Sequence, residues 1–392
     1  MPSETHPSLA HELEKGLRGL EAQSQLRSLT EISGVNLCSN DYLGLSENAE
    51  LKEAVLDAVR KTTLIGGTGS RLLSGHARVW EELEEVFAKF AGTESALYFG
   101  SGYTANIGLL TSLAGKHNII FSDTLNHASI IDGVRLSGAR KIIYPHLDVY
   151  ALEALLRSHG GERCRKLIVT ESVFSMNGDV APLEKLSALA ERYGAELIVD
   201  EAHATGVHGP GGRGLVVAAG RRAHAFATVH TCGKALASAG AFVCGPSVLK
   251  EHLINHARTF IFSTAMPPYM AGQIRAALHL ASKMDAQREA LLDRARRLAS
   301  ALAADGWDTC GAGSQIVPVV IGKNEDTISA AEHLQRGGFA VRAIRPPTVP
   351  AGSARLRFSL TAAISQAEID RLQKSLSVWR AQQQTPVAAG HA

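Results

Sequence analysis

Three side chains with useful chemistry follow two short apolar runs near the middle of the chain. Asp200 comes directly after the run 197–199, His203 follows three residues later, and Lys234 comes after the run 227–229. Such short apolar runs are typical of buried strands. In open α/β sheets, ligands bind beyond the carboxyl ends of the strands. We therefore expect the acid, the imidazole and the amine to share one site.

The residue types indicate chemistry on an amine and a heterocycle. Lys234 lies among small residues (TCGKALASAG), and a buried lysine amine can lose its proton and act as a nucleophile. A carboxylate at Asp200 can hold a proton on a ring nitrogen and make that ring an electron sink, as pyridoxal phosphate (PLP) requires. It can equally cap the next helix. His203 can reach the same ligand, although a single histidine is more often structural.

A candidate anion site lies in GSGYTAN, residues 100–106, between an apolar run and a helical stretch. Ser101, Gly102 and Tyr103 occupy this strand-to-helix turn. Backbone N–H groups at such a turn can bind a phosphate at the positive end of a helix. The string matches no nucleotide-binding motif, so an ordinary turn explains it equally well when it is taken alone.

Three further residues extend the same interpretation. His127 follows another apolar run and can stack on a planar ring, while Ser175 in ESVFSMNGD supplies a hydroxyl group. Arg357 alternates with Leu356 and Phe358 and is suited to bidentate capture of a carboxylate. Each residue alone has a structural explanation, but together they match the needs of PLP chemistry on amino acids.

The strand-like and helical stretches that must position these residues alternate in a pattern that predicts an α/β fold. Seven strand-like runs alternate with helical stretches, a pattern that favours a mostly parallel sheet covered on both faces. After residue 285 a long helix and further strand-like runs predict a smaller α+β domain. We divide the chain into an N-terminal helix and strand segment (1–48), a large PLP-binding domain (49–284), a small C-terminal domain (285–381) and a disordered tail (382–392). The predicted strands of the large domain are 96–100, 118–123, 141–145, 167–172, 197–200, 227–231 and 241–245.

Composition excludes several classes of protein. The 392 residues include 40 basic and 38 acidic side chains, a balance that gives no support for binding to nucleic acid or to an anionic membrane. No apolar run is long enough to span a bilayer, and the N-terminus lacks the features of a signal peptide. The five cysteines are scattered without metal-ligand spacing. We expect a cytoplasmic protein without a metal site.

The longer strings of the chain resemble the α-oxoamine synthases of PLP fold type I, from about residue 20 to 380. This family couples an amino acid to an acyl thioester with loss of carbon dioxide. The string AIRPPTVPAGSARLRFSLTAA resembles the branch that condenses L-alanine with a pimeloyl thioester to 8-amino-7-oxononanoate in biotin biosynthesis. The other matching strings are SNDYLGLS, GTGSRLLSGH, GSGYTANIGLL, LNHASIIDG, ESVFSMNGD, VDEAHATGVHG, GKALASAGAFV and STAMPP.

The resemblance implies a role for each candidate residue. Lys234 would carry PLP, Asp200 would pair with the pyridine nitrogen, and His203 would bind the ring oxygen. His127 would stack on the ring, and these four residues form the expected catalytic set. The family is a homodimer that shares its active site, so Thr264 would reach the cofactor of the partner. The resemblance further implies cofactor contacts for Ser101, Gly102, Tyr103, Ser175 and Thr231, and substrate contacts for Arg27, Asn40, His127, Thr348 and Arg357.

Three alternatives stay open at this point. One is a sister synthase that uses glycine with acetyl-CoA or succinyl-CoA. Another is a catalytically silent scaffold subunit, which the presence of Lys234 disfavours. The last is a dinucleotide-binding oxidoreductase, which the α/β pattern allows but which lacks an early GxGxxG after its first strand. The residues do not distinguish coenzyme A from a carrier protein as the acyl donor.

Overall fold

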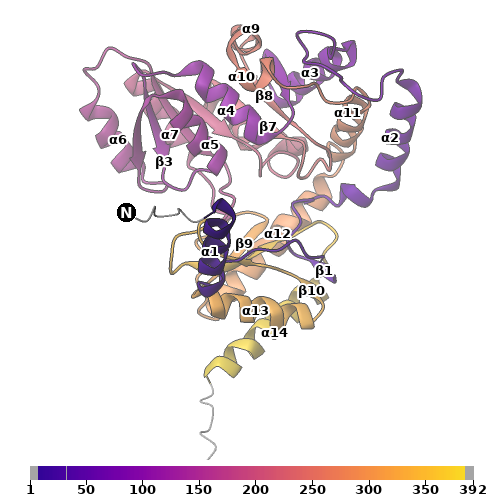
Figure 1. Ribbon diagram of the computed structural model, residues 1–392, viewed down its shortest axis with the longest axis vertical. Helices are drawn as coiled ribbons and strands as arrows, with labels where there is room; N and C mark the ends of the chain where they lie inside the picture. The colour runs from indigo at the N-terminus through magenta and orange to yellow at the C-terminus, as the bar shows by residue number, and fades with distance from the viewer. Residues whose placement is uncertain (1–7, 32, 385–392) are drawn as a thin grey trace, which may run out of the picture.

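The computed structural model describes residues 8–31 and 33–384. A large sheet with helices on both sides forms the upper part of the molecule in Figure 1, and a smaller sheet with its helices lies below it. The large sheet has seven strands in the order β2-β8-β7-β6-β5-β3-β4. These are β2 (Ser95–Phe99), β3 (Ile119–Asp123), β4 (Arg140–Tyr144), β5 (Lys166–Glu171), β6 (Ala195–Asp200), β7 (Ala227–Thr231) and β8 (Ala241–Gly245).

The predicted α/β class with a mostly parallel sheet is confirmed. Strands β4, β3, β5, β6 and β7 run parallel to one another, whereas β8 is antiparallel to both β2 and β7. Every residue of β3, β5, β7 and β8 is buried, as expected for strands that helices cover on both faces. This double burial explains why the strands appear as continuous apolar runs in the sequence.

Apolar side chains pack on both faces of the large sheet. Leu109 and Ile130 belong to the cluster on one face, and Leu186 and Leu189 to the cluster on the other. The helices of this part are α2 (Ala49–Lys61), α3 (Arg78–Ala91), α4 (Gly102–Leu113), α5 (Ala128–Ser137), α6 (Val149–Ser158), α7 (Leu183–Tyr193), α8 (Leu215–Ala219), α9 (Ser247–His256), α10 (Arg258–Ile261) and α11 (Tyr269–Ala281). Short 3-10 turns lie at Leu45–Glu47, Pro210–Gly212 and Gly220–Arg222.

The smaller sheet is antiparallel, with the order β11-β12-β9. The segment 339–344 forms two short strands, because β10 (Phe339–Ala340) leaves this sheet to pair with β1 (Val35–Asn36). The N-terminal segment therefore packs on the small sheet's side of the molecule (Figure 1). The elements here are α12 (Asp285–Ala304), β9 (Ile316–Gly322), α13 (Asn324–Arg336), β10 (Phe339–Ala340), β11 (Ala343–Ile344), β12 (Ala354–Ser359) and α14 (Gln366–Gln384).

The structure differs from the sequence-based expectation near both ends. The helix expected within 1–48 is α1 (Leu9–Ala22), and it ends before Ser24, whose φ is +53°. The strand expected in the same segment, β1, has two residues, because the Asn36 side chain accepts the N–H groups of Cys38 and Ser39 and turns the chain. Helix α14 includes residues 382–384 of the expected tail, and residues 385–392 lie outside the described part.

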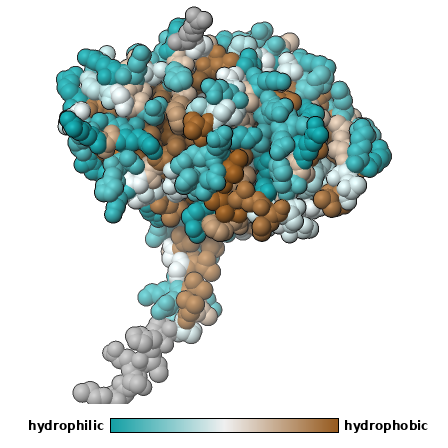
Figure 2. All heavy atoms as spheres, turned by 90° about the horizontal axis from the view of Figure 1, so that it is seen from above, coloured by the Kyte–Doolittle hydropathy of each residue, from teal (hydrophilic) through white to brown (hydrophobic). Residues whose placement is uncertain are grey.

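Several apolar side chains remain on the surface of this single chain. No residue of α1 is buried, and its leucines are exposed, with Leu9 at 70%. In the view from above, Figure 2 shows hydrophobic groups between the hydrophilic regions of that face.

Within the described residues, no helix is long and apolar enough to cross a membrane.

Candidate active site

The candidate residues gather at one edge of the large sheet. Asp200 is the last residue of β6, Glu171 the last of β5 and Thr231 the last of β7. Glu171 and Asp200 are Cα partners in the parallel pairing of β5 with β6. Because parallel strands end at the same edge, three polar side chains meet there, where α/β sheets bind ligands.

A chain of hydrogen bonds extends from Lys234 into the protein. Lys234 Nζ lies 2.8 Å from His203 Nε2, and His203 Nδ1 lies 2.7 Å from the Tyr42 hydroxyl. That hydroxyl donates to Asn40 Oδ1 at 3.0 Å. A neutral imidazole completes this chain, since its Nδ1–H donates to the hydroxyl and its Nε2 accepts from the amine.

The surroundings favour the neutral forms of both Lys234 and His203. Burial lowers the pKa of Lys234 to about 8, against the opposing effect of the carboxylates of Asp200 and Glu171. Burial also lowers the pKa of His203 well below its usual value, and the nearby amine of Lys234 lowers it further. A large fraction of Lys234 is therefore the free amine, which can act as a nucleophile or as a base.

Asp200 is held by donors on both of its oxygens. Asn106 Nδ2 donates to Oδ2 at 2.7 Å, and the Ala202 N–H donates to Oδ1 at 2.8 Å. The same Asn106 amide donates to Ser129 Oγ at 2.9 Å, and that hydroxyl lies 2.8 Å from His127 Nδ1. This network fixes the carboxylate and orients the His127 ring at the start of α5. Burial lowers the pKa of His127.

The turn before α4 has the features of an anion site. The Ser101 side chain caps the helix and forms a reciprocal capping box with Thr104. Among the described residues, the N–H groups of Gly102 and Tyr103 have no hydrogen-bond acceptor. Thr231 lies beside the turn, with Oγ1 3.7 Å from the point where a Cβ on Gly102 would lie. Free N–H groups at a helix N-terminus bind phosphate.

Two more of the predicted cofactor residues lie at or near this turn, Tyr103 and Thr264, and both make contacts with other residues of the chain. The Tyr103 ring meets the His127 ring edge-on at a centroid distance of 6.2 Å, and its hydroxyl donates to Asp132. Thr264 pairs with Ser70 in an isolated bridge and lines a small cavity of about 30 Å³ that Gly100 also lines.

Arg357 connects the small sheet to the site. Its Nε donates to the Ser175 carbonyl, and its Nη1 donates to Ser359 Oγ at 2.8 Å. Its Nη2 donates at 3.2 Å to Asn40 Oδ1, which also accepts the Tyr42 hydroxyl. The expected carboxylate-binding arginine and the expected cofactor lysine therefore belong to one hydrogen-bond network.

The other two expected substrate residues meet at a separate turn. Arg27 Nη2 donates to the Pro346 carbonyl at 3.1 Å, and the Thr348 N–H donates to the Arg345 carbonyl at 3.1 Å. No hydrogen bond among the described residues joins Arg27 or Thr348 to Lys234. Arg27 and Thr348 are therefore not members of the hydrogen-bond network around Lys234.

Sequence reasoning missed four residues of the site. Tyr42 lies in SNDYLGLS and Asn106 in GSGYTAN, both strings that the resemblance had singled out. Glu171 is 2% exposed and its Oε1 has no partner within the described chain. Burial raises its pKa to about 8, and the charge of Asp200 adds to this effect. Gln315 donates to the His203 carbonyl at 2.8 Å across 112 positions, a contact for which the sequence carries no signal.

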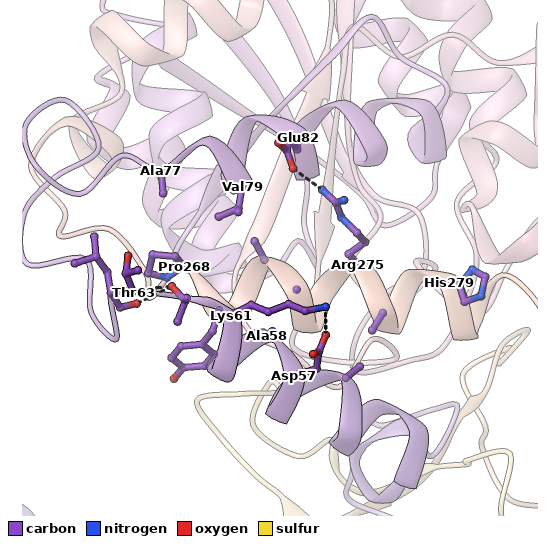
Figure 3. Close-up of a pocket in the computed structure, with 17 residues that line it drawn as sticks. Asp57, Ala58, Lys61, Thr63, Ala77, Val79, Glu82, Pro268, Arg275 and His279 are labelled. Atoms are coloured by element: carbon purple, nitrogen blue, oxygen red, sulfur yellow. Dashed lines mark hydrogen bonds and ion pairs between the residues drawn. The ribbon is translucent and has the colours of Figure 1, made fainter.

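A cavity of about 800 Å³ lies elsewhere, between α2, α3 and α11. Figure 3 shows two ion pairs on its wall, Lys61 with Asp57 at 2.7 Å and Arg275 with Glu82 at 3.5 Å. None of the candidate site residues lines it. The chemistry described above therefore belongs to the strand-end site and not to this cavity.

Comparisons with known proteins identify the family. Residues 32–376 match the model of the class I and II aminotransferases. The chain is 45% identical over 355 residues to a putative 8-amino-7-oxononanoate synthase of Geobacillus kaustophilus, covering 90% of each chain. It is 45% identical over 379 residues to the 8-amino-7-oxononanoate synthase of Geobacter sulfurreducens, covering 93% of this chain and 95% of that protein. The chain belongs to the 8-amino-7-oxononanoate synthase family.

Solved structures agree with this membership. Serine palmitoyltransferase of Sphingomonas wittichii matches with a TM-score of 0.88 at 29% identity, over 97% of this chain and 100% of that one. The 8-amino-7-oxononanoate synthase of Francisella tularensis matches with a TM-score of 0.75 at 29% identity, over 90% of this chain and 98% of that one. The family consists of PLP-dependent acyltransferases of fold type I. The predicted fold type, cofactor and enzyme class are thereby confirmed.

The residues at the strand ends fit PLP. The site contains an amine with a lowered pKa, a buried acid fixed by two donors, and a helix start with free N–H groups. These three groups match the aldehyde, the ring nitrogen and the phosphate of the cofactor. Lys234, Asp200 and the 101–103 turn would hold it.

Proposed function

We propose that this chain condenses L-alanine with a pimeloyl thioester to give 8-amino-7-oxononanoate, carbon dioxide and the free thiol. The thiol belongs either to coenzyme A or to a carrier protein. The observation that supports this most directly is the bond of Lys234 to His203 in a network that also contains Arg357. The names of the relatives support the choice of product.

Lys234 and His203 would handle the protons. When bound, PLP supplies an electron sink for the pair of electrons left on Cα of the amino acid. The free amine of Lys234 takes the Cα proton, which its lowered pKa permits near pH 8. His203 accepts a hydrogen bond from that amine through Nε2, so it keeps the amine oriented. Asp200 provides the negative charge that holds a proton on the ring nitrogen.

Arg357 would bind the carboxylate of the amino acid. Its guanidinium is fixed on three sides by Ser175, Ser359 and Asn40, so its orientation is set before the substrate arrives. A planar guanidinium held in this way can pair with a carboxylate through two N–H groups. His127, whose ring is oriented by Ser129, would stack on the cofactor and help to polarise the thioester carbonyl.

We further propose that the chain acts as a homodimer in the cytoplasm. The exposed leucines of α1 support association, because an apolar helix face is normally covered in the working assembly. Thr264 would then contribute to the cofactor site of the partner. The contacts of Arg27 and Thr348 with the acyl chain also stay proposals.

A substrate panel tests the proposed function. The purified chain with PLP is assayed with L-alanine, glycine or L-serine, each combined with pimeloyl-CoA, acetyl-CoA or palmitoyl-CoA, and the products are identified by mass spectrometry. We expect alanine with pimeloyl-CoA to give the highest kcat/KM and the mass of 8-amino-7-oxononanoate. A higher kcat/KM for glycine with acetyl-CoA would support a sister synthase instead and would refute the proposal.

A further inference from the structure

A histidine outside the site described so far is bonded to two carboxylates. His146 lies between β4 and α6, with Nδ1 2.8 Å from Asp123 Oδ1 and Nε2 2.7 Å from Asp179 Oδ2. Asp123 also accepts the N–H groups of Leu125 at 2.8 Å and Leu147 at 2.9 Å. Both ring nitrogens face carboxylate oxygens, and an imidazole that donates from both nitrogens is an imidazolium. The geometry therefore describes a charged bridge.

The bridge is largely shielded from water. The side chains of His146, Asp123 and Asp179 are 19%, 0% and 11% exposed. Although burial lowers the pKa of His146, the two aspartates outweigh it through hydrogen bonds and charge and raise it to about 9. The edge of the imidazole ring packs against Phe174 at a centroid distance of 4.4 Å. Other titratable or charged groups near the bridge are Tyr144 at the end of β4, Cys310, which feels the charge of Asp179, and Arg355 on β12.

Asp179 belongs to a hairpin, residues 172–180, that carries Ser175. Val173 and Val180 pair across it, and the Phe174 N–H donates to the Asp179 carbonyl at 3.0 Å. The His146 bridge ties this hairpin to Asp123 at the end of β3, and so to the large sheet.

The other side of the hairpin holds the small sheet. The Ser175 carbonyl accepts Arg357 Nε, and Asn177 Oδ1 accepts Arg355 Nη1 at 2.6 Å. The Gly313 N–H donates to the Gly178 carbonyl at 2.9 Å. The hairpin is thus fastened to the large sheet through His146 and to β12 through the two arginines.

We propose that His146 is a positioning residue that fixes the hairpin so that Ser175 orients Arg357 for the carboxylate of the amino-acid substrate. This inference rests on the proposed function, because it takes Arg357 as the carboxylate ligand. Neutralising the bridge leaves two buried aspartates that repel each other, which loosens Asp179 and with it the Ser175 carbonyl. Arg357 then loses the acceptor that sets the plane of its guanidinium.

The bridge also sets a pH dependence. A histidine whose folded pKa is raised contributes its stabilisation fully below its unfolded pKa of about 6.5, and this contribution is lost as the pH rises through the folded pKa, here about 9. The KM for alanine should therefore rise above pH 9 in the parent protein. Titration of the substrate's own amine also changes KM, but it does so equally in His146→Gln, so the rise in the parent should be the larger of the two.

The test compares four variants as PLP-loaded enzymes. His146→Gln removes the charge of the bridge, Asp179→Ala removes the acceptor on the hairpin, and Arg357→Lys tests the proposed carboxylate ligand itself. The matched control is His159→Gln, another half-buried histidine, whose hydrogen bonds go to Ser158 and the Leu155 carbonyl and not to the hairpin. We measure kcat and KM for alanine between pH 7.5 and 10, together with hydrogen exchange of the peptide that contains 172–180.

We expect His146→Gln to raise the KM for alanine about tenfold with less than a threefold change in kcat, and to speed exchange in 172–180. Asp179→Ala removes the acceptor that ties the hairpin to His146, so it should act in the same direction, and it tests the proposal where His146→Gln does not fold. An Arg357→Lys enzyme with an unchanged KM refutes the carboxylate role of the arginine. If Arg357→Lys raises the KM for alanine while both bridge variants keep the parental KM and exchange rate, the positioning role of His146 is refuted and the carboxylate role of Arg357 stands.

Discussion

Tyr42 offers a sharp test of the hydrogen-bond network around Lys234. Its hydroxyl lies 2.7 Å from His203 Nδ1 and donates to Asn40 Oδ1 at 3.0 Å, and the side chain is fully buried. Tyr42→Phe removes this single oxygen and leaves the ring in place. The His203 N–H then has no acceptor, and an unsatisfied buried donor costs about 1–3 kcal/mol.

The lost hydroxyl should affect both stability and catalysis. We expect the free energy of unfolding in denaturant to fall by about 1–3 kcal/mol. His203 is also free to adopt the other tautomer, in which Nε2 carries the proton and no longer accepts from Lys234. If half to all of the lost energy acts on the transition state, kcat/KM for thiol release falls by about 2- to 160-fold, at 1.36 kcal/mol per tenfold.

Tyr144 provides the matched control. It is equally buried, yet its hydroxyl has no hydrogen-bond partner among the described residues. Tyr144→Phe should therefore leave stability unchanged or raise it, and should leave kcat/KM close to the parent value. The reasoning is refuted if Tyr42→Phe matches Tyr144→Phe in both measurements.

Three further predictions concern Lys234 and Asp200. Lys234→Ala should reduce turnover by at least about 10³-fold and abolish the visible absorbance of bound cofactor, and residual turnover near the parent rate would contradict its role. Asp200→Asn should retain cofactor but lower kcat by about 10²- to 10³-fold, because an amide carries no charge and can accept from only one of the donors Asn106 and Ala202. In cofactor-free protein, folded Lys234 binds fewer protons than the unfolded chain between about pH 8 and 10.5, so unfolding free energy should rise with pH in this range. Lys234→Met should lack that rise, and equal pH profiles of the two proteins would show that burial does not lower the pKa of Lys234.

Much of the fold could be predicted because most strands of the large sheet are covered on both faces and are largely apolar, although the edge strand β4 is mostly exposed. The parallel order also places Asp200 and Thr231 at the same edge of the sheet. The local sequence pattern did not predict the structure where long-range contacts determine it, as in residues 23–34. There Arg345 donates to the Ser24 carbonyl across 321 positions, and the hydrophobic periodicity of the sequence carries no sign of such a contact.

The candidate site likewise contains residues that the local sequence pattern indicates and residues that only the tertiary contacts reveal. Residues that follow strands, such as Asp200 and Lys234, could be identified from their place in the pattern. Tyr42 could not, because its partner His203 lies 161 positions away and its side chain looks like any core aromatic. Glu171 was hidden for a different reason, since an acid at the end of an apolar strand is normally solvated, and only the structure shows it buried without a partner at Oε1.

The central claim is that Lys234, opposite Asp200, is the amine that holds the cofactor. Borohydride reduction of the PLP-loaded protein fixes the cofactor to that amine, and peptide mass mapping then locates it. We predict one pyridoxyl phosphate per chain on the peptide that contains Lys234, and none in Lys234→Ala. A stoichiometric adduct on another lysine, such as Lys166 or Lys250, would contradict the account.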